Sequence, residues 1–234
     1  LEAATTLVDA LKGKEAVVSQ IKKKSFSQSP YAPFTTSTLQ QDGVRKLNMS
    51  SDRVMKAAQK LYEGTGNGGY ITYMRTDSIN LSAEAINDIR SFVSGEKTLG
   101  KQLLPNSPRE YKTKAKNAQE AHEAIRPTKM DMTPDRLRQE SSLDQDELKL
   151  YALIWKRTIA SQLVNAEFES TVVDIDCGDG QFRANGKVLV FPGFLAVYDV
   201  SKDIEDDSED NSLPSMSEGD KLPNKDVVPE QHFT

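Results

Sequence analysis

The chain has 234 residues, of which 37% are hydrophobic and 28% charged, enough for one or two domains with real cores. No apolar run is long enough to span a bilayer, and no secretory signal is visible. The single cysteine, Cys177, excludes an internal disulfide and a cysteine-cluster zinc site within the chain. Because the sequence opens on Leu1, we expect an internal piece of a longer protein.

The formal net charge of −5 is unevenly distributed. Residues 201–220 contain eight acidic side chains and one lysine, which predicts a solvated acidic loop. The rest of the chain is therefore slightly basic, and the overall charge argues neither for nor against a nucleic-acid partner.

The first part of the chain predicts helices around one strand. The expected elements are a helix over Leu1–Lys12, a strand over Glu15–Ile21, a linker through Pro33, and helices over Ser37–Leu47 and Asp52–Glu63. Ser82 is the expected N-cap of the next helix, with Gly95 at its end. The spacing of Asn117 and Glu120 resembles a capping box and predicts a helix that carries His122 and stops at Pro127.

Two further helices follow, and then the pattern changes. Thr133-Pro134 predicts a short helix and Asp144-x-x-Glu147 a long one. From Glu167 the apolar residues alternate with period two. This predicts a hairpin turn at Gly178-Asp179-Gly180 and strands over Gln181–Val190, Phe194–Val200 and Lys225–Val228. We expect an α+β fold in which a helical domain, residues 34–163, is inserted between β-rich segments, residues 1–33 and 164–234.

Gly69–Ser78 is the most informative stretch. Its β-branched and aromatic start predicts a short strand, so Tyr73, Arg75 and Asp77 would project from one side. A phenol has a reference pKa near 10 and needs activation to act as a nucleophile. A neighbouring guanidinium favours the phenolate and binds phosphate oxygens, so the pair suits phosphoryl transfer. Spacing alone still favours a packed strand tyrosine beside a surface arginine.

Three ordered motifs carry a family resemblance. Gly69-Tyr-Ile-Thr-Tyr-Met-Arg-Thr-Asp-Ser78 resembles the active-site segment of type IA DNA topoisomerases, the bacterial topoisomerase I group. Pro33–Gln41 matches upstream and Gln119–Pro127 matches downstream, in the same order. The resemblance implies a tyrosine-bearing helical domain within a β-rich hinge domain that forms part of an arch.

The resemblance also implies an activity and roles for individual residues. Tyr73 would form a 5′-phosphotyrosine link to a cut single strand, Arg75 would stabilise phosphate charge, and His122 and Asp77 would support cleavage. The expected DNA-binding residues are Thr36, Ser37, Thr38, Gln40, Gln41 and Arg126; for Arg126, a phosphate contact and anchoring of a carboxylate such as Asp77 remain open. In the intact enzyme, strand passage and religation would relax negative supercoils without ATP.

The expected cofactor of the intact enzyme is Mg²⁺, held by an acidic Toprim domain that this sequence does not contain. No metal ligands are predicted here, because Asp174 and Asp176 lack the spacing of a calcium loop. The expected partners are single-stranded or negatively supercoiled DNA and the missing Toprim and groove-forming domains of the same polypeptide. The chain alone would be inactive. The expected location is with DNA in the bacterial cytoplasm or, in a eukaryote, in an organelle or the nucleus.

Two other functions are considered. Helix, short turn, helix and strand also describe a helix-turn-helix DNA-binding module, in which Tyr73 would be only structural. A tyrosine recombinase or type IB topoisomerase also uses a phosphotyrosine. Those enzymes place the tyrosine after the His/Arg cluster, whereas Tyr73 precedes His122.

Overall fold

The computed structural model describes residues 2–66, 68–96, 99–111, 122–198, 212–223 and 227–228, with side chains from residue 6 onward. The chain forms two compact units. The first, here called the sheet unit, comprises the described parts of residues 1–27, 167–191 and 208–234. The second, the helical unit, comprises those of residues 28–166 and 192–207.

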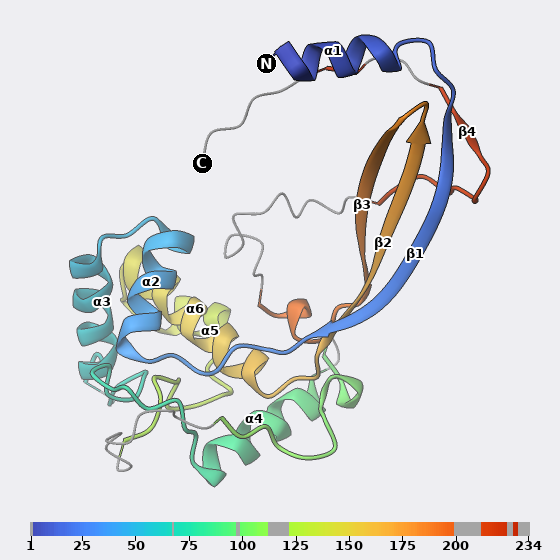
Figure 1. The fold of residues 1–234 in the computed structure, drawn as a ribbon. Helices are drawn as coiled ribbons and strands as arrows, with labels where there is room; N and C mark the ends of the chain where they lie inside the picture. The colour runs from blue at the N-terminus through green and yellow to red at the C-terminus, as the bar shows by residue number, and fades with distance from the viewer. Residues whose placement is uncertain are drawn as a thin grey trace. The chain divides into compact units, whose positions relative to one another are not determined.

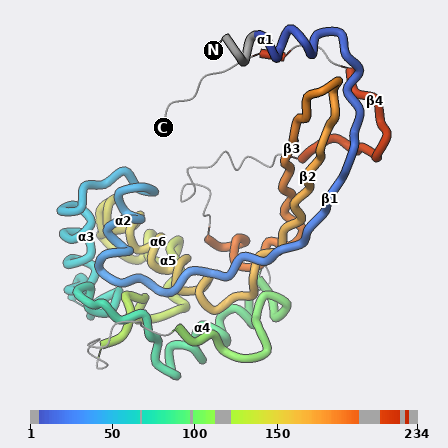
Figure 2. The backbone as a smooth tube through the Cα atoms, in the orientation of Figure 1, coloured from blue at the N-terminus to red at the C-terminus, as the bar shows by residue number. Residues whose placement is uncertain are grey.

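The sheet unit contains α1 (Glu2–Leu11) and four strands: β1 (Ala16–Gln28), β2 (Ala166–Cys177), β3 (Gly180–Phe191) and β4 (Lys221–Leu222), in the order β3-β2-β1-β4 (Figure 1). The hairpin of β2 and β3 is antiparallel, and the backbone trace shows its tight turn (Figure 2). Gly178 occupies this turn with φ 57°, a conformation that favours glycine. Leu11, Ala16 and Cys177 form a small buried core where α1, β1 and β2 meet.

Three strand predictions in this part of the sequence need correction. β1 continues to Gln28, well past the predicted end at Ile21, because the Lys/Ser run stays extended beside β2, where Ser170 donates to the Lys24 carbonyl at 3.1 Å. The strand predicted from Phe194 is wrong: a 3₁₀ helix, η2 (Gly193–Ala196), lies there, and residues 199–200 lie outside the described residues. Of Lys225–Val228 the structure describes residues 227–228, which are not a strand.

The helical unit is built around α6 (Gln145–Ser161), which packs against α2 (Thr36–Leu47), α3 (Ser51–Glu63) and α5 (Pro134–Glu140) (Figure 1). Its remaining helices are α4 (Ala83–Gly95), η1 (Lys101–Leu103) and η2. The predicted N-caps are confirmed: Ser82, Thr133 and Asp144 each accept a hydrogen bond from the first turn.

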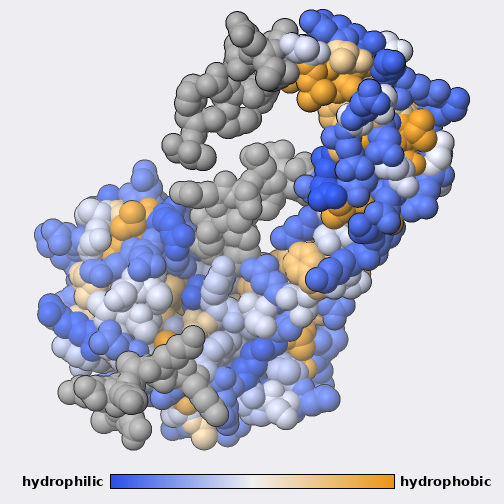
Figure 3. Space-filling view, viewed as in Figure 1, coloured by the Kyte–Doolittle hydropathy of each residue, from blue (hydrophilic) through white to orange (hydrophobic). Residues whose placement is uncertain are grey.

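The α+β fold class is confirmed, because antiparallel strands and packed helices occupy different units. The visible face of the molecule is largely polar, with small hydrophobic patches (Figure 3). Among the described residues, no helix combines the length and apolar character needed to cross a membrane. Residues 192–198 group with the helices, and the domain limits predicted from the sequence stay a prediction.

Candidate active site

The tyrosine segment, Gly69–Ser78, follows α3 and lies against the described residues of the downstream motif, Gln119–Pro127, which come more than fifty residues later. Ile71 forms an antiparallel bridge with Pro127, and the Thr72 N–H donates to the Arg126 carbonyl at 2.9 Å. The Thr72 hydroxyl donates to the Ala124 carbonyl at 2.7 Å. A single bridge at Ile71 replaces the predicted strand, because the pairing does not continue beyond it.

Buried and exposed residues alternate through the tyrosine segment, although it is not part of a sheet. Tyr73 is 42% exposed, and Arg75 and Asp77 are also exposed. Between them, Met74 and Thr76 are buried at 1% and 7% exposure. Tyr73, Arg75 and Asp77 are therefore all exposed, as predicted, whereas their common direction and their chemical roles stay predictions.

Thr36 connects the start of α2 to the tyrosine segment. Its hydroxyl donates to the Met74 carbonyl at 2.8 Å and accepts from the Thr76 N–H at 2.9 Å. The Thr36 N–H donates to the Thr76 carbonyl at 2.9 Å. This predicted DNA-binding residue thus uses its hydroxyl inside the protein, where it fixes the backbone on both sides of Arg75.

The other predicted DNA-binding residues of α2 fall into two groups. Thr38 forms a capping box with Thr35, the N-cap of α2, so its hydroxyl is also engaged within the chain. Ser37 and Gln41 are exposed, and Gln40 is partly buried. These three side chains take no part in the capping box, and their DNA contacts stay a prediction.

The predicted helix around His122 is wrong for the residues that the structure describes. Residues 122–127 are not helical, and residues 117–121 lie outside the described part of the chain. Ile125 instead forms a bridge with Phe34, and the Ala124 N–H donates to the Asn80 carbonyl at 2.9 Å. These backbone partners override the local helical pattern. His122 is exposed and makes no hydrogen bond to another described residue.

Arg126 pairs with Glu123. Its Nε and Nη2 donate to the same Glu123 oxygen at 3.0 and 2.7 Å, and its Nη1 donates to the Pro127 carbonyl at 2.9 Å. The side chain is 17% exposed. Arg126 therefore anchors a carboxylate, as one alternative expected, but this carboxylate is Glu123 and not Asp77; a phosphate contact by Arg126 stays a prediction.

Glu123 itself was missed by the sequence reasoning. Its other oxygen accepts from the backbone N–H of Ser82, the N-cap of α4, at 2.7 Å. Burial alone would raise the pKa of Glu123, but the hydrogen bonds from Ser82 and Arg126 outweigh it, and the pKa is lowered. A carboxylate in the downstream motif therefore fixes the beginning of the helix that follows the tyrosine segment.

Tyr62 is a second feature that the sequence did not reveal. Its ring meets the Tyr73 ring edge to face, with the centroids 5.2 Å apart and an interplanar angle of 66°. Tyr62 lies in the last turn of α3 and is 40% exposed. The signal available in the sequence was an aromatic residue outside the buried stripe of that helix.

A buried polar cluster supports α2 from within the helical unit. Arg157 lies 3.4 Å from a carboxylate oxygen of Asp42 and donates to the Ala32 carbonyl at 2.7 Å. The Tyr198 hydroxyl donates to the same carboxylate, and burial is the main reason why the pKa of Tyr198 is raised. The guanidinium also lies 4.7 Å from the ring centre of Phe34, the bridge partner of Ile125. The cluster therefore ties α2 and α6 to the backbone that the downstream motif contacts.

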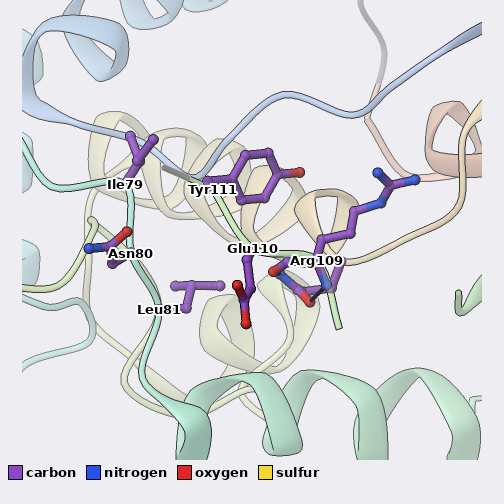
Figure 4. A pocket seen from close by; sticks show the side chains of 7 residues that line it. Ile79, Asn80, Leu81, Arg109, Glu110 and Tyr111 are labelled. Atoms are coloured by element: carbon purple, nitrogen blue, oxygen red, sulfur yellow. Dashed lines mark hydrogen bonds between the residues drawn. The ribbon is translucent and has the colours of Figure 1, made fainter. Parts of the chain in front are cut away.

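A pocket of about 330 Å³ lies beside the end of the tyrosine segment. It is lined by Ile79, Asn80, Leu81, Arg109, Glu110, Tyr111 and Gln162 (Figure 4). The Tyr111 hydroxyl donates to the Ser161 carbonyl at 2.7 Å, and burial raises the pKa of Tyr111 to about 12. This tyrosine is therefore a structural phenol rather than a second nucleophile.

No group of three or more His, Cys, Asp or Glu side chains among the described residues is arranged to hold a metal ion. Asp174 is instead paired with Arg183, whose Nε lies 2.6 Å from its oxygen, and the hydrogen bond from Arg183 lowers the pKa of Asp174. The described donor set does not fit the Mg²⁺ expected for the intact enzyme, so no step below is assigned to the metal.

The three sequence motifs thus meet through backbone hydrogen bonds around an exposed tyrosine. Comparison with known proteins identifies the family. The family model described as DNA topoisomerase matches residues 1–234, the whole chain. The chain belongs to the bacterial type IA DNA topoisomerases. Membership in this family excludes the tyrosine recombinase and type IB alternatives.

Named relatives of this topoisomerase chain agree. It is 46% identical to DNA topoisomerase 1 of Rickettsia felis over 99% of the chain and 30% of the relative. It is 43% identical to DNA topoisomerase 1 of Mycolicibacterium smegmatis over 99% of the chain and 25% of the relative. The structure of full-length topoisomerase I from Thermotoga maritima matches with a TM-score of 0.73 and 33% identity, covering 94% of this chain and 34% of that chain. The topoisomerase chain therefore spans about 30% of the length of such relatives.

Proposed function

We propose that this chain supplies the strand-cleaving tyrosine of a type IA DNA topoisomerase. The observation that carries the proposal is the exposure of Tyr73 at the point where the three family motifs are joined, by the Ile71–Pro127 bridge, the Phe34–Ile125 bridge and the hydrogen bonds of Thr36. Its hydroxyl makes no hydrogen bond to a described residue, which leaves it accessible to a phosphodiester.

In the proposed reaction the Tyr73 Oη attacks a phosphorus atom of a single strand. An O–P bond forms to the tyrosine, the bond from phosphorus to the 3′-oxygen breaks, and the strand end becomes a 5′-phosphotyrosine. The phenolic proton leaves Oη and a proton is gained by the departing 3′-oxygen, so the step is a transesterification without net redox change. Religation reverses it, and because the covalent link conserves the phosphodiester, ATP is not needed.

Arg75 has the proposed role of stabilising charge on the phosphate. It is exposed two residues from Tyr73, and it makes no ion pair with a described residue. A guanidinium that has no carboxylate partner keeps its donor fork available for phosphate oxygens. His122 and Asp77 have supporting roles in the proposal, because both are exposed on segments that border the tyrosine.

The remaining parts of the activity are assigned to the longer polypeptide. We propose that the Mg²⁺ ligands and the other walls of the strand groove lie outside this chain, as the family resemblance implies. The proposed substrate is a single-stranded region of negatively supercoiled DNA, and the proposed location is with DNA inside the cell.

A matched pair of tyrosine variants tests the proposal in the complete polypeptide. Tyr73→Phe removes the nucleophilic oxygen but keeps the ring, so relaxation and covalent complexes are lost while non-covalent strand binding is retained. Tyr70→Phe is the control, because the Tyr70 hydroxyl lies 2.6 Å from that of Thr65 and has no proposed chemical role. Equal loss of activity in both variants would show that the tyrosines are only structural, as in the helix-turn-helix alternative.

A further inference from the structure

The contact between Tyr62 and Tyr73 joins two exposed aromatic rings at the site of the proposed nucleophile. Their centroids lie 5.2 Å apart at 66°, an edge-to-face geometry that aromatic pairs favour. Tyr62 and Tyr73 are 40% and 42% exposed. A ring pair in this position is not part of the hydrophobic core.

Tyr62 lies on α3 at the border between the core-facing side and the surface. The buried stripe of the helix consists of Val54, Ala57, Ala58 and Leu61. Tyr62 lies four residues after Ala58, at the edge of this stripe, and its ring, 40% exposed, meets the ring of Tyr73 there. Its ring is therefore not buried in the core of the helical unit, and the ring of Tyr73 is its aromatic neighbour.

The backbone of Tyr62 is held firmly against the tyrosine segment. The Tyr70 N–H donates to the Leu61 carbonyl at 2.7 Å. A Cβ added at Gly69 would lie 2.1 Å from the Tyr62 carbonyl oxygen, so glycine is required at this close approach. The two chain segments therefore have a fixed spacing, which keeps the ring of Tyr62 within contact distance of the ring of Tyr73.

The side chain of Tyr73 has few other restraints. Its backbone neighbours are fixed by Thr36 and by the bridge at Ile71, but its hydroxyl makes no hydrogen bond within the described part of the chain. An exposed phenol without such a restraint samples several rotamers. Attack on phosphorus requires one orientation, and the reaction slows in proportion to the time spent in the others.

We propose that Tyr62 is a positioning residue for Tyr73, whose ring it holds in the orientation that attacks the phosphodiester. This inference rests on the proposed function of Tyr73, and it adds a residue that orients the Tyr73 ring for the reaction. The hydroxyl of Tyr62 is not required, because the contact is made by the ring. Tyr62→Phe therefore retains the effect and Tyr62→Ala removes it.

The test measures single-turnover cleavage and religation of a labelled single strand by the complete polypeptide at saturating enzyme. Tyr62→Ala should lower the cleavage rate by roughly two- to tenfold, the range expected for one edge-to-face aromatic contact. The religation rate should change less than twofold, because the phosphodiester link already holds the Tyr73 ring in the adduct. The affinity for the uncleaved strand should be unchanged, and Tyr62→Phe should restore cleavage.

Matched variants separate positioning from general effects. Phe182→Ala removes another exposed aromatic side chain, on β3, and should leave the cleavage rate unchanged. If Tyr62→Ala does not fold, Tyr62→Leu keeps apolar volume without the aromatic edge and should show the same loss of cleavage.

Three results would overturn the inference. Wild-type cleavage by a folded Tyr62→Ala or Tyr62→Leu variant would show that the ring contact does not matter. A loss confined to strand affinity would make Tyr62 a DNA contact instead of a positioning residue. Covalent complexes formed by Tyr73→Phe, measured in parallel, would refute the proposed function itself, and that outcome is recognised independently of any Tyr62 variant.

Discussion

Replacing Thr36 by valine tests how the tyrosine segment is held. Valine has nearly the same shape but lacks the hydroxyl that donates to the Met74 carbonyl and accepts from the Thr76 N–H. Leaving a buried polar group unpaired costs about 1–3 kcal/mol. Thr36 is only partly buried, so water can replace part of the loss. We therefore expect the loss of both hydrogen bonds, to the Met74 carbonyl and from the Thr76 N–H, to cost about 1–3 kcal/mol of local stability. This corresponds to roughly a 5- to 150-fold change in a local opening equilibrium.

The measurement is amide hydrogen exchange of the peptide that contains Thr76, combined with single-turnover cleavage in the complete polypeptide. Thr36→Val should speed exchange at Thr76 by the factor above and slow cleavage, because Tyr73 and Arg75 lie in the loosened segment. Thr36→Ser keeps the hydroxyl and should behave like the wild type. If Thr36→Val weakens strand binding but leaves exchange unchanged, Thr36 contacts DNA and the bracing role argued from the hydrogen bonds is wrong.

Three further predictions follow from the same site. Arg75→Lys should lower single-turnover cleavage by about 10²–10³, because an ammonium lacks the guanidinium fork; a rate within twofold of the wild type would contradict the phosphate role. Glu123 has a lower pKa folded than unfolded, so its stabilisation of the α4 start is present above the unfolded value, near 4.3, and is lost as the pH falls through the folded value. Thermal unfolding between pH 3 and 6 should therefore be less sensitive to acid in Glu123→Gln than in the wild type, and identical pH profiles would argue against this carboxylate. The chain alone should bind single strands weakly and in a salt-sensitive manner and form no covalent adduct with Mg²⁺; an adduct on a denaturing gel would place a metal site within it.

Features that depend only on neighbouring residues were predicted correctly from the sequence. Ser82 and Asp144 cap helices as predicted, because an N-cap needs only its own hydroxyl or carboxylate and the next turn of backbone. The exposure of Tyr73 and Arg75 was also predictable from the alternation of residue types, although the backbone bends at Thr72 and Met74.

Features that depend on distant partners were not predictable. The helix expected around His122 fails because Ile125 pairs with Phe34, which lies about ninety residues earlier in the chain. The role of Glu123 depends on an N–H of Ser82, 41 residues away, and nothing in the local pattern distinguishes it from a surface carboxylate. The contact between Tyr62 and Tyr73 likewise depends on the turn that brings Gly69 against α3.

The central claim is that Tyr73 is the residue that becomes attached to DNA. The most direct test is to trap the covalent complex of the complete polypeptide with a labelled single strand, digest the DNA and the protein, and map the remaining nucleotide by mass spectrometry. The account predicts a 5′-phosphate on the peptide that contains Tyr73, and no adduct from the Tyr73→Phe variant. A nucleotide on another residue, or an adduct of unchanged yield from Tyr73→Phe, would contradict it.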